Sequence, residues 1–243
     1  MRDRRKKRLS PGKRAALVLA ILIVLGGIGA LVYPAVSQWW NARGQSEVVA
    51  DYAEEISGLG DIDKDAELQR AREHNQSLTD AAALTDPFSS EGAVDTADYN
   101  TLLWATQEGV MAYLEIPKIS VLLPIYHGVS RDVLYKGVGH LPETSLPVGG
   151  ESTHCVLAGH SGMNHARLFT DLPKLEIGDE FHIYVYDEKL TYTVDQIKPV
   201  IPTDTRDLTI AEGKDYVTLL TCVPVGVNSH RLLVRGTRTY TVE

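Results

Sequence analysis

Cysteine is scarce in this chain: only Cys155 and Cys222 occur among its 243 residues. Small disulfide-stapled domains carry more cysteines in a shorter chain, so that class of scaffold is excluded. His154 and His160 would complete a set of zinc ligands, but the four residues lack the spacing of a structural zinc site, which makes zinc the least favoured alternative. We therefore expect no metal and no cofactor, although the acidic stretch at residues 204–207 leaves weak calcium binding open.

The two cysteines stand in different sequence contexts. Cys155 lies inside the β-type run of residues 153–157, which favours a small buried core thiol. A Cys155–Cys222 bridge formed under oxidation stays open as an alternative, because the sequence does not give the distance between them. Cys222 ends an apolar run, and a turn rich in Pro, Gly, Asn and Ser separates it from a second β-type run that opens with Arg231. Two adjacent strands joined by this loop would bring a thiol and a guanidinium together at one end of a sheet.

Such a pair has the makings of a nucleophilic site. A cysteine at a strand end is better exposed than one in mid-strand, and a fixed positive charge favours the reactive thiolate. The missing part is a base, and His160 is the candidate because Gly159 and Ser161-Gly162 frame it in a tight turn. A lone histidine is usually structural, and we interpret six others in that way: His127, His140, His154, His165, His182 and His230.

Charge is missing altogether from residues 15–42. The apolar core of this stretch, residues 15–36, would span roughly 33 Å as a helix, which is enough to cross a bilayer. Residues 2–14 hold eight Lys or Arg against one acid, and Trp39 and Trp40 follow where an outer interfacial belt would lie. A cleaved signal peptide has a shorter apolar region and a small-x-small site, so we disfavour it. We expect a cytoplasmic basic tail at 1–14 and a single-pass transmembrane helix at 15–40.

Positive charge is scarce beyond the apolar stretch. Residues 44–243 carry 31 acids and 15 bases, which excludes nucleic acid as a partner and fits an external, solvated domain. Residues 44–83 have no proline and only three glycines. Apolar residues at helical spacing and a break at residues 58–61 predict a helical hairpin there, an extracellular spacer over 41–83. Its apolar positions are Val48, Val49, Tyr52 and Ile56, then Leu68, Ala71, Leu78, Ala81 and Ala82.

The rest of the chain favours strands over helices. Period-2 alternation and turn residues predict a mostly β fold, an antiparallel barrel of seven or eight strands. A short helical connection is expected at residues 166–175. The expected strands cover residues 113–116, 121–125, 155–158, 180–186, 190–198, 216–221 and 231–240.

Residues 218–222 read Thr-Leu-Leu-Thr-Cys, which is the TLxTC signature of sortases. Three further blocks match in the same order: residues 139–150, the segment around His160, and residues 228–238. On these blocks, which cover most of residues 75–240, the chain resembles the class C, pilus-assembling branch of the sortase family. The resemblance implies an eight-stranded sortase-type β-barrel, which we expect over residues 93–243. Class C members commonly carry a second, C-terminal membrane helix, and no second apolar span is present here.

The resemblance also implies a lid. In class C sortases an Asp-Pro-aromatic tripeptide covers the active site, and Asp86, Pro87 and Phe88 match it in the expected lid loop at 84–92. Carried across, Asp86 would pair with Arg231 and Phe88 would cover Cys222. Taken alone, the tripeptide is only a helix-terminating turn. A carboxylate beside a guanidinium is a sensible latch, because the pair can be bidentate yet breaks where water reaches it.

The activity that the resemblance implies is transpeptidation. Cys222 would be the nucleophile that cleaves an LPxTG-type sorting signal between Thr and Gly, His160 the general acid and base, and Arg231 the oxyanion and substrate stabiliser. Arg231 is preferred to Arg235 and Arg238 by its distance from Cys222 and by the family match. Expected partners are LPxTG-bearing pilin or surface proteins, an acceptor pilin lysine and, through the N-terminal helix, the membrane, with the catalytic domain extracellular. Alternatives are a housekeeping sortase that transfers to a cell-wall peptide amine of lipid II, and a non-catalytic extracellular binding module.

One segment invites a false match. Residues 141–145 read Leu-Pro-Glu-Thr-Ser, which resembles a sorting signal. A true signal precedes a hydrophobic span and a basic tail, whereas this one precedes the catalytic core. We therefore interpret residues 141–145 as a scaffold loop, and Arg167 as a solvated helix charge.

Overall fold

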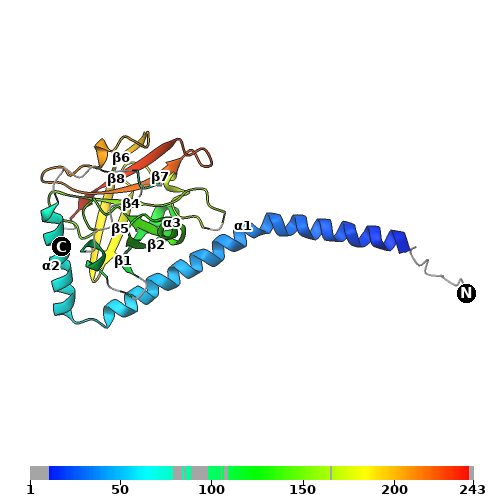
Figure 1. Ribbon diagram of the computed structural model, residues 1–243, viewed down its shortest axis with the longest axis horizontal. Coiled ribbons are helices and arrows are strands. Elements are labelled where there is room, and N and C mark those ends of the chain that lie inside the picture. The colour runs from blue at the N-terminus through cyan, green and yellow to red at the C-terminus, as the bar shows by residue number, and fades with distance from the viewer. Residues whose placement is uncertain are drawn as a thin grey trace, which may run out of the picture.

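The computed structural model describes residues 11–78, 84, 86–88, 98–104, 106, 109–164 and 166–240. Eight strands close into a barrel in the order β1-β2-β3-β4-β7-β8-β6-β5, with a long helical arm at one side (Figure 1). The mostly β fold and the eight-stranded barrel that we predicted are confirmed. The strands are β1 (Val110–Ile116), β2 (Val121–His127), β3 (Val138–His140), β4 (Thr153–Ala158), β5 (Glu180–Val185), β6 (Glu188–Val200), β7 (Asp215–Val223) and β8 (His230–Thr239).

The pairing corrects one part of the prediction. Most neighbours are antiparallel, but β2–β3 and β4–β7 are parallel, so the barrel is mixed. Parallel strands need a crossover, and the link from β2 to β3 holds a helix that the sequence patterns had not indicated, α3 (Arg131–Lys136). β3 was missed as well, because a strand of three residues, Val-Gly-His, is too short to show an alternation.

The helical part also differs from the prediction. The expected transmembrane helix and the first helix of the expected hairpin form one continuous helix, α1 (Pro11–Ser57), with Pro34 inside it. Figure 1 shows this helix bending part-way along, as a proline that removes a helix hydrogen bond predicts. The break after it is confirmed, since Gly58 to Gly60 separate α1 from α2 (Asp61–Ser77). Ala81 and Ala82, assigned to the second helix, lie outside the described residues, as do residues 1–10 of the basic tail.

Four 3₁₀ turns complete the described elements: η1 (Tyr99–Thr101), η2 (Pro117–Ile119), η3 (Leu172–Lys174) and η4 (Arg206–Leu208). The helical connection predicted at residues 166–175 is therefore wrong except for η3, because Pro173 allows one tight turn there and no longer helix. Residues 141–145 form a buried turn in which the Thr144 hydroxyl donates to the Leu141 carbonyl at 2.8 Å and accepts from the Val156 amide at 3.1 Å. This agrees with a scaffold loop.

Buried hydrogen bonds hold the helices α1 and α2 against the barrel. The Tyr52 hydroxyl of α1 donates to the Met111 carbonyl at 3.3 Å and accepts from the Tyr186 amide at 2.9 Å. The Asn75 side chain of α2 pairs with both backbone groups of Leu146, at 2.7 and 3.1 Å. Because such groups are costly to leave unpaired when buried, these contacts fix where α1 and α2 lie on the barrel.

The buried apolar residues form two clusters. The larger fills the barrel and includes Cys155 and Phe169. The smaller holds residues from β4, β7, β8 and the η4 region, and Leu84 and Phe88 pack against it from outside. Leu84 and Phe88 of the predicted lid loop therefore pack on an apolar surface close to the ends of β7 and β8.

Candidate active site

Cys222 and Arg231 face each other as register partners on the antiparallel strands β7 and β8. The β-branched and apolar residues of β7 keep it extended until Pro224, which cannot donate to the ladder, and a turn then returns the chain. The Arg231 guanidinium also donates from Nη1 to the carbonyls of Asn228 and His230, at 3.0 and 3.1 Å. Both side chains are buried, so the expected thiol–guanidinium pair is present at the strand ends.

His160 lies in the turn that follows β4, and three contacts fasten this turn to β7. The Gly159 amide donates to the Leu220 carbonyl at 3.0 Å, and the Thr221 hydroxyl donates to the Gly159 carbonyl at 2.7 Å. The Ser161 hydroxyl donates to the Cys222 carbonyl at 2.6 Å. A Cβ at position 159 would lie 2.7 Å from the Phe169 ring, so only glycine fits beside the histidine.

The described lid residues cover this group of side chains. The Asp86 carboxylate accepts from Arg231 Nε at 2.8 Å and from Nη2 at 2.6 Å, a bidentate pair. The Phe88 ring centroid lies 5.3 Å from that of His160, and the Arg231 guanidinium carbon lies 5.3 Å from the same phenyl ring. The structure thus brings all six predicted residues together: Cys222, His160, Arg231, Asp86, Pro87 and Phe88. Thr85 and residues 89–92 of the predicted lid loop lie outside the described part of the chain.

The surroundings of Cys222 shift the pKa of its thiol. Burial raises the pKa of Cys222 above its ordinary value; the Arg231 charge lowers it, and the Asp86 carboxylate raises it again. The hydrogen-bonded Asp86 in turn raises the pKa of Arg231. With the lid in place, therefore, the thiol is protonated at neutral pH and the guanidinium is fully charged. The Arg231 charge, which lowers the pKa of the thiol, is paired with the Asp86 carboxylate.

His140 and His154 take buried structural positions. Burial lowers the pKa of His140 to about 3 and that of His154 to about 4, so both rings are neutral. His140 bonds to the Tyr99 hydroxyl and the Ser145 carbonyl, each at 2.8 Å. His165 lies outside the described residues, and Arg167 pairs with Asp171 in a turn, where the sequence had predicted a helix.

The disulfide alternative is wrong. Cys155 pairs in register with Val217, and Cys222 lies five residues farther along β7, so the Cα atoms are about 16 Å apart. A disulfide requires less than about 7 Å. The His154 ring bonds to the Thr209 carbonyl at 2.9 Å and the Thr218 hydroxyl at 2.8 Å. Within the described ranges, His, Cys, Asp and Glu form no group of three that could hold a metal, and this speaks against zinc.

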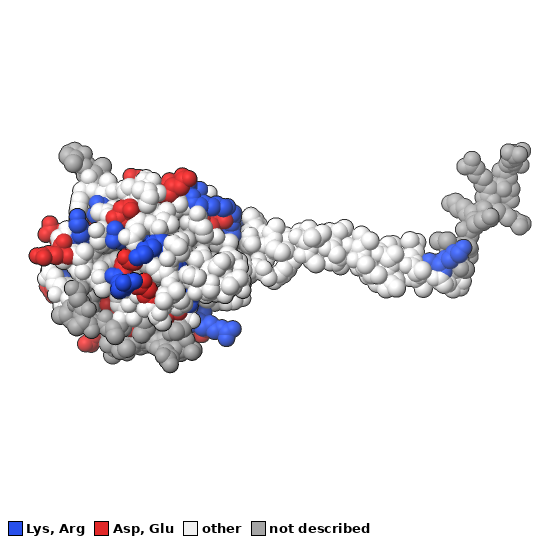
Figure 2. Space-filling model, turned by 90° about the horizontal axis from the view of Figure 1, so that it is seen from above, with Lys and Arg blue, Asp and Glu red and all other residues white. Residues whose placement is uncertain are grey.

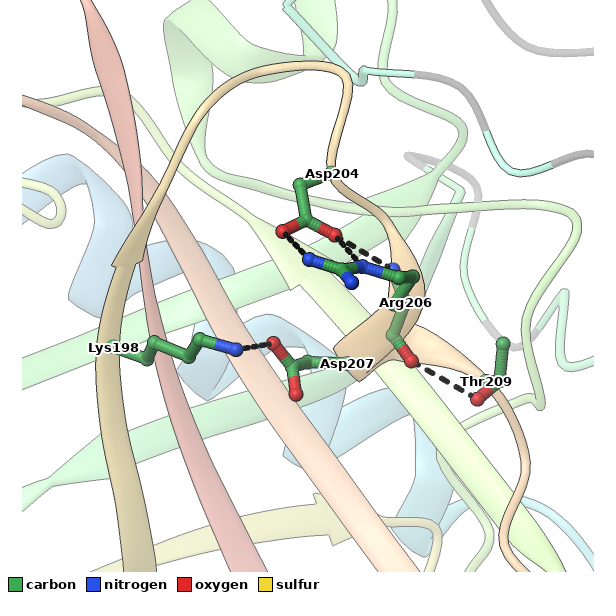
Figure 3. Close-up of polar contacts among 5 residues, drawn as sticks. All are labelled: Lys198, Asp204, Arg206, Asp207 and Thr209. Atoms are coloured by element: carbon green, nitrogen blue, oxygen red, sulfur yellow. Dashed lines mark hydrogen bonds and ion pairs between the residues drawn. The ribbon is translucent and has the colours of Figure 1, made fainter.

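The acidic stretch at residues 204–207 is neutralised by its neighbours (Figure 3). The Arg206 guanidinium holds both Asp204 oxygens at 2.8 Å and lowers the pKa of that carboxyl to about 2. Lys198 reaches Asp207 at 2.5 Å. A cation would have to displace both basic side chains, so the structure gives no support to calcium binding here.

Sequence reasoning missed the residues that hold the site in shape. The Ser161 and Thr221 hydroxyls lie next to His160 and Cys222 in the chain and tie the two segments together. The available signal was that each flanks a predicted site residue. Their acceptors are 61 and 62 residues away in the sequence, which no local pattern encodes.

A closed barrel that presents a thiol, an imidazole and a guanidinium at one end defines a class, the barrel-type cysteine transpeptidases. The family model described as the sortase domain matches residues 114–239, and the chain belongs to the sortase family. Among solved structures, sortase C-1 from Streptococcus pneumoniae is 44% identical, with a TM-score of 0.75, and covers 81% of this chain and 100% of its own. Sortase C-1 from Actinomyces oris is also 44% identical, with a TM-score of 0.69, over 73% of this chain and 98% of its own.

Curated relatives agree on the family. A protein named sortase A from Bacillus anthracis is 29% identical over 163 residues, which are 67% of this chain and 72% of that protein. The solved neighbours carry the class C name at higher identity than this relative, so the resemblance to class C sortases is confirmed.

Proposed function

We propose that this chain is a membrane-anchored class C sortase that cleaves an LPxTG-type signal between Thr and Gly and transfers the acyl group to a pilin lysine amine. The observation that carries the proposal is the register pairing of Cys222 with Arg231, beside a His160 turn fastened to the same strand. No pair elsewhere in the described chain combines a strand-end thiol with a guanidinium.

The proposed chemistry has two acyl transfers. The Cys222 thiolate attacks the carbonyl carbon of the Thr–Gly bond, His160 protonates the departing glycine amine, and a thioester forms as the C–N bond breaks. The lysine ε-amine then attacks the thioester and gives a proton to His160, so an isopeptide bond forms and the thiol is released. Arg231 stabilises the oxyanion in each step, because a fixed charge in a partly dry cleft needs no reorganisation.

In this proposal the lid acts as a gate. The Asp86 carboxylate binds the Arg231 guanidinium that the oxyanion needs, and the Cys222 thiol is protonated. Opening the lid frees the guanidinium and removes a negative charge near the thiol. When the lid opens, Leu84 and Phe88 lose their contacts with the smaller apolar cluster. Opening therefore costs free energy, which substrate contacts must offset.

The membrane anchor is the N-terminal part of α1. Within the described residues one helix is long and apolar enough to cross a bilayer, and its large apolar side chains are exposed, with Leu31 82% accessible. Exposed apolar surface of this extent is typical of a membrane contact. In Figure 2 the arm is white from the barrel to the blue side chains near its far end, and this uncharged length supports the proposed span.

The test is intact-mass analysis of the full chain in detergent, incubated with an LPxTG-type peptide. We expect a thioester adduct on the parent and on Asp86→Ala, more abundant in the latter, and none on Cys222→Ala. A lysine-bearing pilin peptide is expected to remove the adduct and gain its mass, whereas preference for a wall-peptide amine would indicate the housekeeping alternative. Absence of any adduct from both cysteine-containing proteins, across several signal peptides, would refute the enzyme and favour a binding module.

A further inference from the structure

The helix α1 passes from the exposed arm onto the barrel without an intervening linker. Trp39 and Trp40 are 60% and 70% exposed, and they end the apolar arm. Contact with the barrel starts within the next turns, where the Gln45 side chain donates to the Lys136 carbonyl at 3.2 Å. Five helical residues from Trp40 to Gln45 rise only about 7.5 Å. The barrel therefore begins one to two turns beyond the tryptophans.

A groove of about 310 Å³ opens at this level between α1, β2 and α3. Pro124, Tyr126 and Ala166 supply part of its wall, and Tyr135 at its rim is 57% exposed. The polar layer of a bilayer is about 5–7 Å thick on each side. If the tryptophans mark the edge of the hydrocarbon, as tryptophans in membrane proteins do, the groove lies at the height of the lipid headgroups.

The charges at this level suit an anionic surface. The short helix α3 exposes Arg131 and Lys136 against a single acid, Asp132, and the Lys136 ammonium lies 3.9 Å from the Tyr126 ring centroid. The Arg43 guanidinium lies over the Trp39 ring at 5.9 Å. Arg131 and Lys136 stand out in a region, residues 44–243, that has about twice as many acids as bases, and Arg43 directly precedes it. Basic side chains beside a membrane span attract anionic lipid headgroups.

We propose that the barrel rests on the bilayer, with α3 and the groove beside it in the headgroup layer of anionic phospholipids and Tyr135 at the interface. This inference rests on the proposed membrane anchor and adds a docking face to it. It also has a consequence for the site. Ala166 of the groove wall belongs to the loop that starts at His160, whose carbonyl accepts from the Phe169 amide at 3.0 Å. The active site then opens near the membrane surface, where a signal held by its own hydrophobic span is presented.

The test uses tryptophan fluorescence of the full chain in vesicles of phosphatidylcholine and phosphatidylglycerol that contain lipids spin-labelled at the headgroup. Trp39, Trp40 and Trp104 are replaced by Phe, and one reporter is added, Tyr135→Trp. The matched control is Tyr240→Trp, because Tyr240 is 66% exposed and the C-terminal end lies on the side of the barrel away from the arm (Figure 1). We expect the headgroup label to cause a loss of fluorescence at position 135 and none at position 240.

Two further arms separate this proposal from the anchor. Trp104→Phe alone, which keeps Trp39 and Trp40, reports on the anchor. Quenching of Trp39 and Trp40 with none at position 135 would overturn the docking face and leave the anchor intact, and no quenching at any position would refute the anchor as well. We expect Arg131→Glu combined with Lys136→Glu to reduce the loss at position 135, and to reduce it more with phosphatidylglycerol than with phosphatidylcholine alone. Equal quenching at position 135 in vesicles with phosphatidylglycerol and in vesicles of phosphatidylcholine alone would overturn the proposed role of anionic headgroups.

Discussion

Two cysteines lie on neighbouring strands of one barrel, and they differ in the residues that surround them. Cys155 points into the main core in the middle of β4, and burial together with the nearby Asp215 carboxylate raises its pKa well above the ordinary value. Cys222 lies one residue before the end of β7 and pairs with Arg231, whose guanidinium binds Asp86 from a segment that is not part of the barrel. Burial by the core is permanent, whereas the proposed function requires the lid segment to open.

The comparison shows that packing residues and candidate site residues occupy different positions along the strands of one sheet. Mid-strand positions carry side chains that pack, and strand ends carry side chains that a loop can cover or uncover. Burial and the Asp86 charge both raise the pKa of the Cys222 thiol, while the Arg231 guanidinium, which lowers it, is fixed by backbone carbonyls of its own loop.

The most direct way to break the comparison is to remove each thiol in turn. We expect Cys222→Ala to lose transpeptidation by on the order of 10⁴-fold or more, since the nucleophile is gone. Cys155→Ala is expected to keep activity within a few-fold of the parent, because Cys155 packs in the main core and pairs with Val217, five residues before Cys222 on β7. Product formation from an LPxTG-type peptide measures both, and comparable losses in the two variants would contradict the division.

The second prediction concerns the guanidinium. Arg231→Lys keeps the charge but loses the fork that holds two oxygens, so we expect turnover to fall by about 10²–10³-fold, the usual effect of removing an oxyanion donor. Arg235→Lys is the matched control, because Arg235 lies on the same strand and makes the same bidentate pair with Asp195, at 2.9 and 3.0 Å. A similar fall in both would show that strand stability, rather than position beside Cys222, matters.

The third prediction sharpens the contrast between permanent and reversible burial. Asp86→Asn removes the latch charge, and alkylation of Cys222 by iodoacetamide should quicken by roughly ten- to a hundredfold, because a charge-assisted pair contributes about 1.5–3 kcal/mol. The pKa of the thiol should fall, since burial and Asp86 both raise it in the closed form. The midpoint of the alkylation rate against pH should therefore move to lower pH.

The control for the latch is Asp195→Asn, which breaks a bidentate pair of the same type on the barrel surface. It should change neither the rate nor the midpoint. Peptide mapping of the alkylated protein is expected to find the label on Cys222 and not on Cys155. An unchanged profile in Asp86→Asn would mean that the carboxylate does not gate the thiol.

The smallest expected effect is on stability. Cys155→Ala leaves a small void in the main core and should lower the free energy of unfolding by about 1–2 kcal/mol, as other deletions of small buried groups do. Cys222→Ala should cost less, because the strand end can relax under the lid. Urea unfolding of both variants at pH 7 measures the difference, and the reverse order would contradict the assignment of the two cysteines to core and site.

Much of this protein could be predicted from its sequence. Alternating apolar residues gave most strands, and the uncharged stretch before Arg43 gave the long apolar helix, because both signals are local and strong. The pairing of Cys222 with Arg231 followed from one short loop between two β-type runs. Position along the chain was enough to predict a contact wherever both residues of the pair lie within one hairpin.

Other features were decided by tertiary structure alone. The parallel pairing of β4 with β7 joins segments more than 50 residues apart, and it places Cys155 about 16 Å from Cys222. Contact between Asp86 and Arg231 spans 145 residues, and family resemblance, not the tripeptide itself, suggested it. The hydroxyls of Ser161 and Thr221 acquire their role only when β4 and β7 lie side by side. Sequence patterns encode which face of a segment is apolar, whereas the closure of the barrel determines which faces meet. The surroundings of Cys222 depend on which faces meet.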